Sequence, residues 1–142
     1  MRKFYFVLCL CFLLTGEFAK AEVTIIIHPS KKNAWTEKQI RDLYLGLLKM
    51  REIELYEQAD GQPARTEFYE KFLNRNENQM KRQRSVSVFS GERVPATLTD
   101  DESVFERVKS HPNAIGYVSS SYFDSHTIKV IEALPISILK IK

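Results

Sequence analysis

The stretch Val23-Thr24-Ile25-Ile26-Ile27-His28 is a nearly continuous run of β-branched and apolar residues, and Pro29 ends it. Runs of this kind are typical of a strand that is buried on both faces, as strands are in a parallel sheet between layers of helices. We therefore expect a buried strand over residues 23–28.

The first helix is marked at its start by Thr36 and Gln39. Their spacing is that of a capping box, in which each side chain accepts a hydrogen bond from the other residue's backbone N–H. Trp35 and Ile40 stand at the two positions of a hydrophobic staple. The apolar residues that follow have helical spacing: Ile40, Leu43, Tyr44 and Leu47. The pattern predicts a helix whose buried stripe includes Leu47.

The middle of the chain alternates between strand and helix patterns. Residues 52–58 predict a second strand, and the turn over residues 60–63 leads into a helix with Pro63 at its first position. Phe68, Phe72 and Leu73 form the apolar stripe of that helix. Residues 74–84 are polar and basic, and residues 90–93 read as a loop.

The last third of the chain follows the same alternation. Thr99 and Glu102 have capping-box spacing ahead of a helix that Pro112 stops, and residues 114–118 predict a short strand. A further strand is predicted over residues 127–131, and the tail from Pro135 is apolar. Strands separated by helices argue for one α/β domain with a mainly parallel sheet. The expected core residues are Ile25, Ile27, Leu43, Leu47, Phe68, Phe72, Phe105, Val108 and Ile115.

The N-terminus has the three parts of a secretory signal peptide. Arg2 and Lys3 precede an apolar run over residues 4–14, and Ala19 and Ala21 are the small residues of a cleavage site. The run is too short for a membrane span. We therefore expect residues 1–21 to be removed and residues 22–142 to form a periplasmic domain that does not itself span the membrane.

The expected mature chain of 121 residues is long enough for one domain with a core. Both cysteines, Cys9 and Cys11, lie in the signal peptide, so no disulfide or cysteine-based metal site is expected. The mature chain has 18 basic and 17 acidic residues, and this balance does not indicate a nucleic-acid partner. The basic run over residues 81–84 is interpreted as a solvated helix face.

The sequence contains no motif that predicts an enzyme. It lacks the nucleophile-elbow, phosphate-loop and zinc-protease signatures, and its three histidines, His28, His111 and His126, have no ligand-like spacing. We expect no catalytic activity, no metal site and no cofactor.

The turn over residues 60–66 is the best candidate for a binding feature. A glycine-containing turn that feeds a helix offers free backbone N–H groups, and Arg65 adds a guanidinium that can hold an anion with two hydrogen bonds. The alternative is an ordinary connection between a strand and a helix, with a surface arginine.

Several stretches, taken in order, resemble one family. These are Ile27-His28-Pro29-Ser30, Ile40-Arg41-Asp42-Leu43-Tyr44-Leu45-Gly46, Thr66-Glu67-Phe68-Tyr69-Glu70-Lys71-Phe72-Leu73, Val88-Phe89-Ser90-Gly91 with Pro95, and His111-Pro112-Asn113-Ala114-Ile115-Gly116-Tyr117-Val118. Together they resemble a family of short proteins related to the substrate-binding proteins of phosphate ABC transporters. The resemblance implies a type II periplasmic binding protein fold, here as a single three-layer lobe.

The chain departs from this family in three ways. Full-length members have two lobes that close on the anion, whereas this chain has the length of one. The hydroxyl-bearing Gly-Ser-Gly-Thr-like turn of the family is replaced here by Asp60-Gly61-Gln62-Pro63-Ala64, and Arg84 stands where relatives tend to have a tryptophan.

Two functions follow as hypotheses. The first is a periplasmic solute-binding module for phosphate or a similar oxyanion, associated with ABC-type transport and an inner-membrane permease. Because ligands of open α/β sheets bind at the carboxyl ends of the strands, its predicted binding residues are Ser30, Gln62, Arg65, Ser119 and Ser120. The alternative is a sensory or protein-interaction module that docks on a membrane receptor or signalling protein.

Export gives the first testable prediction. Intact mass spectrometry of the protein from its native cells is expected to show a chain that begins at Glu22. A full-length chain in the cytoplasm, or one that remains anchored in the membrane, would contradict the predicted cleavage.

Overall fold

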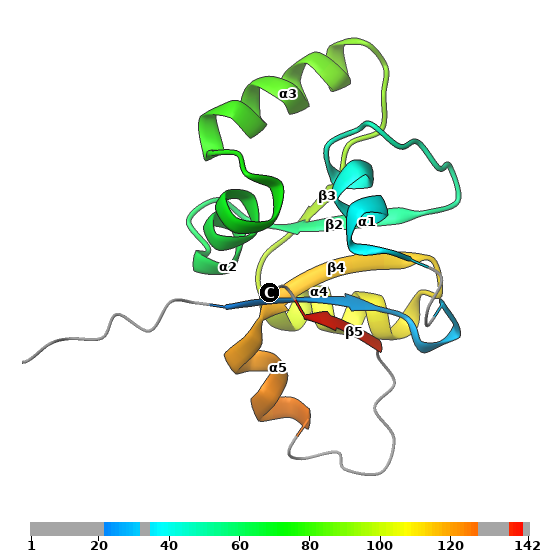
Figure 1. The fold of residues 1–142 in the computed structure, drawn as a ribbon, viewed down its shortest axis with the longest axis vertical. Helices are drawn as coiled ribbons and strands as arrows, with labels where there is room; N and C mark the ends of the chain where they lie inside the picture. The colour runs from blue at the N-terminus through cyan, green and yellow to red at the C-terminus, as the bar shows by residue number, and fades with distance from the viewer. Residues whose placement is uncertain (1–21, 32–34, 128–136, 141–142) are drawn as a thin grey trace, which may run out of the picture.

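The computed structural model describes residues 22–31, 35–127 and 137–140, and these residues form one five-stranded sheet with helices packed against it (Figure 1). The predicted signal peptide and residues 128–131 of the predicted strand over 127–131 lie outside the described residues. The strand order is β3-β2-β4-β1-β5. The strands are β1 (Val23–Ile27), β2 (Glu54–Gln58), β3 (Ala96–Leu98), β4 (Ala114–Ser119) and β5 (Ser137–Lys140).

The sheet is mixed. β2 pairs in parallel with β3 and with β4, whereas β1 pairs antiparallel with both β4 and β5. The α/β class is confirmed, and β1 is buried along its whole length as predicted. β1 was expected to run parallel to its neighbours, and this expectation was wrong. Burial on both faces shows that helices cover both sides of a strand, but it does not show whether the neighbouring strands are parallel or antiparallel.

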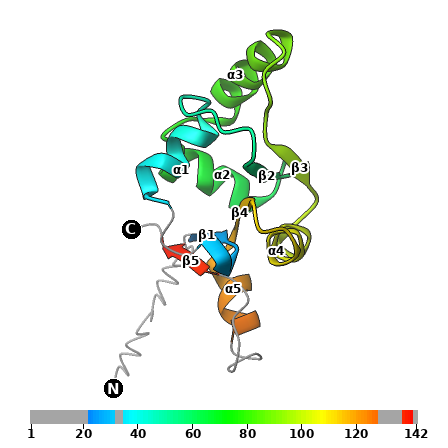
Figure 2. The same cartoon turned by 90° about the vertical axis from the view of Figure 1, so that its right-hand side faces the viewer.

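The helices cover both faces of the sheet (Figure 2). On one face, Ile25 and Ile27 of β1 pack with residues of α1, α2 and η2, and on the other, Ile26 packs with Val104 of α4 and Phe123 of α5. This arrangement is the predicted three-layer lobe. The helices are α1 (Glu37–Tyr44), α2 (Pro63–Glu67), the π-helix η2 (Phe68–Leu73), α3 (Glu77–Phe89), α4 (Asp101–Ser110) and α5 (Ser120–Thr127), with a short 3₁₀ turn, η1 (Pro29–Lys31), after β1.

Eight of the nine predicted core residues are buried, and Leu47 is the exception, with 75% of its surface exposed. The capping box of Thr36 and Gln39 is present, but α1 ends at Tyr44. Gly46 then adopts a positive φ of 73°, a conformation that glycine tolerates and that turns the chain out of the helix. The prediction for Leu47 was wrong because the apolar spacing continues past the residue that ends the helix.

The second half of the chain holds both expected and unexpected elements. The polar, basic segment forms α3, in keeping with the helix face expected over residues 81–84, and α3 begins with a capping box between Asn76 and Gln79. The start of α4 is capped by Asp100, which accepts a hydrogen bond from the backbone N–H of Ser103, and not by the predicted Thr99. Strand β3 and helix α5 were not predicted, and Thr127 ends α5 instead of beginning a strand.

Gly116 of β4 allows α4 to lie close to the sheet. A Cβ atom at this position would stand 2.4 Å from Cγ1 of Val104 and 3.3 Å from Cγ2 of Val108. Only glycine fits under the helix at this distance, so Gly116 fixes how closely α4 approaches β4. Among the described residues, no helix has both the length and the apolarity that crossing a bilayer requires.

The corrected end of α1 gives the second prediction. Phe72→Ala should lower the free energy of unfolding by about 3–5 kcal/mol, because the ring is fully buried. Leu47→Ala should change it by no more than about 0.5 kcal/mol, because the side chain is exposed. Urea unfolding of the two variants measures the difference, and similar losses would show that Leu47 packs in the core.

Candidate functional site

The carboxyl ends of β2 and β4 form the edge at which the predicted site was placed. The paired residues of these strands are Glu54 with Ala114 and Leu55 with Ile115. Beyond them, side chains bridge the two strands. The backbone N–H of Gln58 donates to the Tyr117 hydroxyl at 3.0 Å, and the Gln58 side-chain amide donates to the Tyr117 carbonyl at 3.1 Å.

Asp101, the first residue of α4, fills the space between these strand ends. Its Oδ1 accepts hydrogen bonds from the Gln58 side-chain amide at 2.6 Å and from the Ser119 backbone N–H at 2.8 Å. Its Oδ2 accepts a hydrogen bond from the Ser119 hydroxyl at 2.6 Å. Three donors therefore converge on one carboxylate, in the way that a protein holds an oxyanion.

Arg65 lies on α2 beside this edge and is buried. Its Nε donates to both carboxylate oxygens of Glu77 at 3.1 Å, and its Nη1 donates to the Gln58 carbonyl at 2.8 Å. Nη2 lies 2.7 Å from Glu77 and 3.1 Å from Asp60. Burial alone would lower the pKa of Arg65, but the hydrogen bonds to Glu77, together with the charges of Tyr69, Glu57 and Glu77, outweigh it and raise the pKa above its usual value. The guanidinium is permanently charged and already bound.

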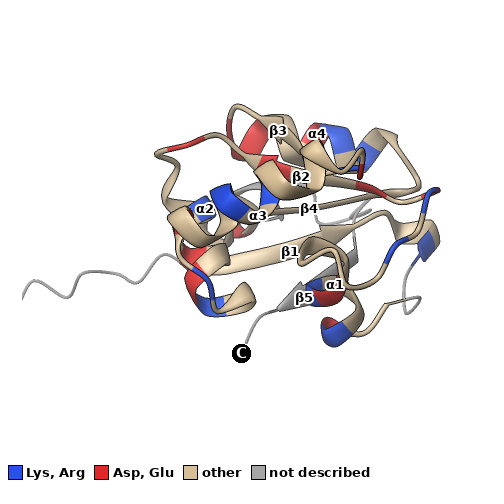
Figure 3. Ribbon diagram, turned by 90° about the horizontal axis from the view of Figure 1, so that it is seen from above, with Lys and Arg blue, Asp and Glu red and all other residues tan. Residues whose placement is uncertain are grey.

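Acidic residues lie close to Arg65, because Asp60 and Glu77 both pair with it, and Figure 3 shows acidic and basic segments near one another around α2. The hydrogen bond from Lys81, followed by the nearby charge of Arg65, lowers the pKa of Asp60 below its ordinary value. Asp60, Glu77 and Asp101 thus bring three negative charges to this edge, against the positive charges of Arg65 and Lys81. A further anion at this edge would meet a net negative charge, because its donors already hold carboxylates.

The basic run over residues 81–84 is only partly solvated. Arg82 is exposed as predicted, but Arg84 is turned inward: its Nη2 bonds the buried carboxylate of Glu57 at 2.6 Å, and its Nη1 bonds the Tyr44 carbonyl at 2.7 Å. The solvated-face interpretation was therefore wrong for Arg84. Charge runs in a sequence do not reveal a carboxylate that lies on a distant strand.

The other predicted site residues are distributed over the molecule. Gln62 is the N-cap residue of α2, and its side chain makes no capping bond. Ser120, the residue after Ser119, forms a hydrogen bond of 2.7 Å between its hydroxyl and that of Thr24. Ser30 follows the end of β1 and bonds the ring of His28 at 2.8 Å.

The structure does not bring Ser30 to the other predicted residues. In the register of β1 and β4, Val23 faces Ser119, and Ile27 faces Ile115. The carboxyl end of β1 therefore lies at the amino end of β4, on the opposite edge of the sheet from Ser119 and Arg65. The expected grouping assumed a parallel β1. Gln58 and Asp101 were not among the predicted site residues. Their positions, at the end of a predicted strand and at the start of a predicted helix, could have indicated them.

Comparison with known proteins shows what this fold resembles. No family model matches the chain, and no curated protein matches it. Among solved structures, a candidate phosphate ABC transporter substrate-binding protein with bound phosphate, from Clostridium perfringens, matches with a TM-score of 0.51 and 23% identity, over 71% of this chain and 40% of that one. A candidate phosphate-binding protein from Planctomyces limnophilus matches with a TM-score of 0.56 and 16% identity, over 85% of this chain and 41% of that one.

The fold resembles one lobe of a phosphate-binding protein. The chain spans about two fifths of the length of these matched proteins. The expected lobe is thus present, and the matched proteins are described as binding proteins and not as enzymes.

The contacts of Asp101 give the third prediction. Asp101→Ala should lower the free energy of unfolding by about 1–3 kcal/mol, because the Ser119 N–H and the Gln58 amide lose their acceptor. Glu102→Ala is the matched control: it removes an exposed acid from the same helix turn and should cost about 0.5 kcal/mol or less. Equal losses in chemical denaturation would show that Asp101 acts only through the charge at the helix start.

Proposed function

We propose that this protein is an exported, non-enzymatic binding module that docks on another protein through the end of helix α3. This function is the protein-interaction alternative that the sequence left open, and the fold, which resembles one lobe of a binding protein, supports it. The observation that carries it is the exposure of three apolar side chains at that end: Val86, Val88 and Phe89 are 66%, 59% and 96% exposed.

Helix α3 is anchored at its first half and uncovered at its second. Met80 is its buried residue, and Gln83 and Arg84 tie it to the carbonyls of Leu45 and Tyr44. Beyond Arg84 the helix runs away from the sheet (Figures 1 and 2). Val86 and Phe89 are three residues apart and share a face of the helix, and Val88 lies on another face. Exposed apolar side chains on one face mark interaction surfaces, and a phenylalanine is a typical anchor for a partner's pocket.

The charge beside these side chains indicates what the partner offers. Arg82 is exposed and lies one helical turn before Val86 and two turns before Phe89, on the same face. The matching surface is an apolar groove with carboxylates at its rim, on a receptor or signalling protein at the membrane. A second copy of α3 fits less well, because it would bring the same cation to the contact.

The fourth prediction tests this surface in the native cells. A photo-crosslinking amino acid at position 89 should give one defined adduct with another protein, and the same group at position 106, an exposed position on α4, should not. Arg82→Glu should reduce the adduct at least about tenfold, because it reverses the charge that faces the carboxylate rim.

Three outcomes would contradict the proposal. They are the absence of an adduct at position 89, an adduct whose mass is that of two copies of this chain, and an adduct that Arg82→Glu leaves unchanged. Binding of the purified protein to vesicles of anionic phospholipid that is lost in Phe89→Ser would instead assign the helix end to a lipid surface.

The second candidate function is a solute-binding module for phosphate or a similar oxyanion, working with an ABC-type permease. The fold favours it, because the matched structure from C. perfringens contains phosphate, and Gln62, Arg65, Ser119 and Ser120 lie on or near one edge. The carboxylates of Asp101 and Glu77 oppose it. It requires that phosphate raise the melting temperature and that Ser119→Ala abolish this effect.

A further inference from the structure

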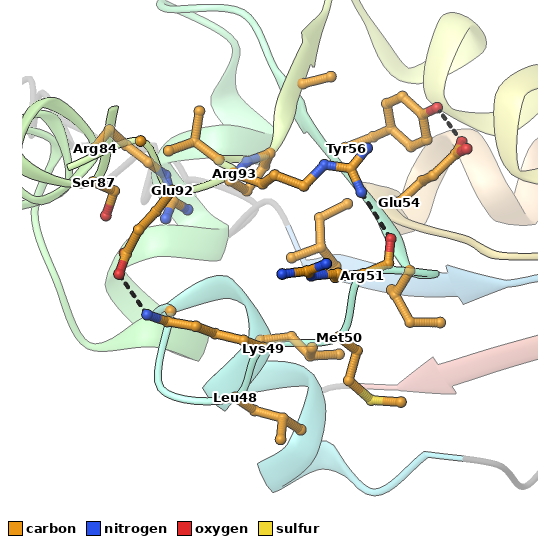
Figure 4. Close-up of a pocket in the computed structure, with 18 of the residues that line it drawn as sticks. Leu48, Lys49, Met50, Arg51, Glu54, Tyr56, Arg84, Ser87, Glu92 and Arg93 are labelled. Atoms are coloured by element: carbon orange, nitrogen blue, oxygen red, sulfur yellow. Dashed lines mark hydrogen bonds and ion pairs between the residues drawn. The ribbon is translucent and has the colours of Figure 1, made fainter. Parts of the chain in front are cut away.

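A second feature of the molecule lies at the amino ends of β2 and β4, on the opposite edge of the sheet from Asp101. A cavity of about 580 Å³ is formed between the chain that follows α1 and the chain that follows α3 (Figure 4). Its volume is in the range of sites that hold small molecules. The predicted binding residues do not line it, and neither do Val86, Val88 and Phe89, the exposed apolar side chains of α3.

The lining of this cavity is strongly basic. It includes five cationic side chains, Lys49, Arg51, Arg84, Arg93 and Arg107, and two acidic ones, Glu54 and Glu92. Two of the cations are neutralised locally, because Lys49 pairs with Glu92, and Arg84 pairs with the buried Glu57.

Three guanidinium groups remain: those of Arg51, Arg93 and Arg107. In the part of the chain that the structure describes, no carboxylate lies within 4.0 Å of them. Arg93 spans the cavity wall and donates from Nη1 to the Arg51 carbonyl at 2.7 Å, as the dashed line in Figure 4 shows. Arg107 lies over the Tyr56 ring, 5.3 Å from its centroid.

These contacts hold the side chains of Arg93 and Arg107 in place and leave most of their donors available. A guanidinium has five N–H donors, and the bond to the Arg51 carbonyl uses one of those on Arg93. The Arg51 side chain is exposed, and its guanidinium points toward the space that Lys49 and Arg93 line (Figure 4). Guanidinium groups without a carboxylate partner bind oxyanions with pairs of parallel hydrogen bonds.

The rest of the wall is apolar. Leu48, Met50 and Ile53 are partly buried against the core, and Val94 and Pro95 complete this side of the cavity. Inorganic phosphate would leave these surfaces in water. An anion that also carries an apolar or ring-shaped body would cover them and gain the free energy of their burial.

We propose that this amino-edge cavity binds an organic phosphate, a phosphomonoester whose phosphate contacts Arg51, Arg93 and Arg107 and whose body lies on Leu48, Met50 and Ile53. Three unpaired cations match the dianionic charge of a phosphomonoester better than the single charge of a carboxylate. The proposal does not depend on the docking function, because the two use different surfaces.

NMR titration of the expected mature chain tests the proposal with three probes: adenosine 5′-monophosphate, adenosine and inorganic phosphate. The monophosphate should shift the amides of residues 49–53 and 93–96 and saturate with a Kd below about 1 mM. Inorganic phosphate should bind at least about tenfold more weakly, because it makes no apolar contact, and adenosine should not saturate.

Arg51→Gln is the informative variant, because no side-chain hydrogen bond or ion pair of Arg51 is found among the described residues, so the fold should survive. It should weaken monophosphate binding about tenfold. Arg75→Gln, which removes an exposed charge that does not line the cavity, should leave the affinity within about twofold. The proposal is wrong if the two variants bind alike, if adenosine or inorganic phosphate binds as well as the monophosphate, or if the shifts lie elsewhere.

Discussion

The space between the carboxyl ends of β2 and β4 is the constraint on which the rest of this structure depends. The paired residues of the two strands end at Leu55 and Ile115, and the polar groups beyond must find other partners. Gln58 bridges to Tyr117, and Asp101 accepts from Gln58 and Ser119. Gly116 permits this closure, because it lets α4 approach β4 closely enough for Asp101 to reach both strand ends.

This closure changes what the carboxyl edge of the sheet can bind. In an open α/β sheet the carboxyl edge is where ligands bind, because backbone donors and helix starts converge there. Here the converging donors hold Asp101, and Arg65 holds Glu77. The edge has the chemistry of an oxyanion site, but the chain's own carboxylates act as the oxyanions.

The position of α3 follows from a second internal pair. The carboxylate of Glu57 is buried on β2 and is balanced by Arg84 and surrounded by tyrosines. Burial, followed by the charge of Glu57, raises the pKa of Tyr117 above its usual value, so its hydroxyl stays neutral. An unpaired buried carboxylate would be costly, and Arg84 therefore fixes the first half of α3 to the sheet. The second half then projects with Val86, Val88 and Phe89 uncovered.

Local features of this fold could be predicted from the sequence, and long-range ones could not. The capping box at Thr36, the proline start of α2 and the buried rings of Phe68 and Phe72 depend on residues a few positions apart, so spacing reveals them. The pair of Arg84 with Glu57 and the contact of Asp101 with Gln58 join residues 27 and 43 positions apart.

The direction of β1 is also a long-range feature that the sequence does not reveal, because a parallel and an antiparallel strand can be equally buried. Since β1 is antiparallel to β4, Ser30 lies at the opposite edge of the sheet from the rest of the predicted site. The polar side chains of a candidate site could thus be chosen by residue type, whereas their partners depended on the register of strands.

The central claim is that the carboxyl edge is closed by Asp101 and Glu77. The most direct measurement follows the backbone amides of Gly61, Arg65, Ser119 and Ser120 by NMR during titration with inorganic phosphate. No saturable shift of these amides is expected up to about 10 mM phosphate, because the N–H groups of Arg65, Ser119 and Ser120 are engaged and the local charge is negative. Saturable shifts of Ser119 and Arg65 with a Kd below about 1 mM would contradict it.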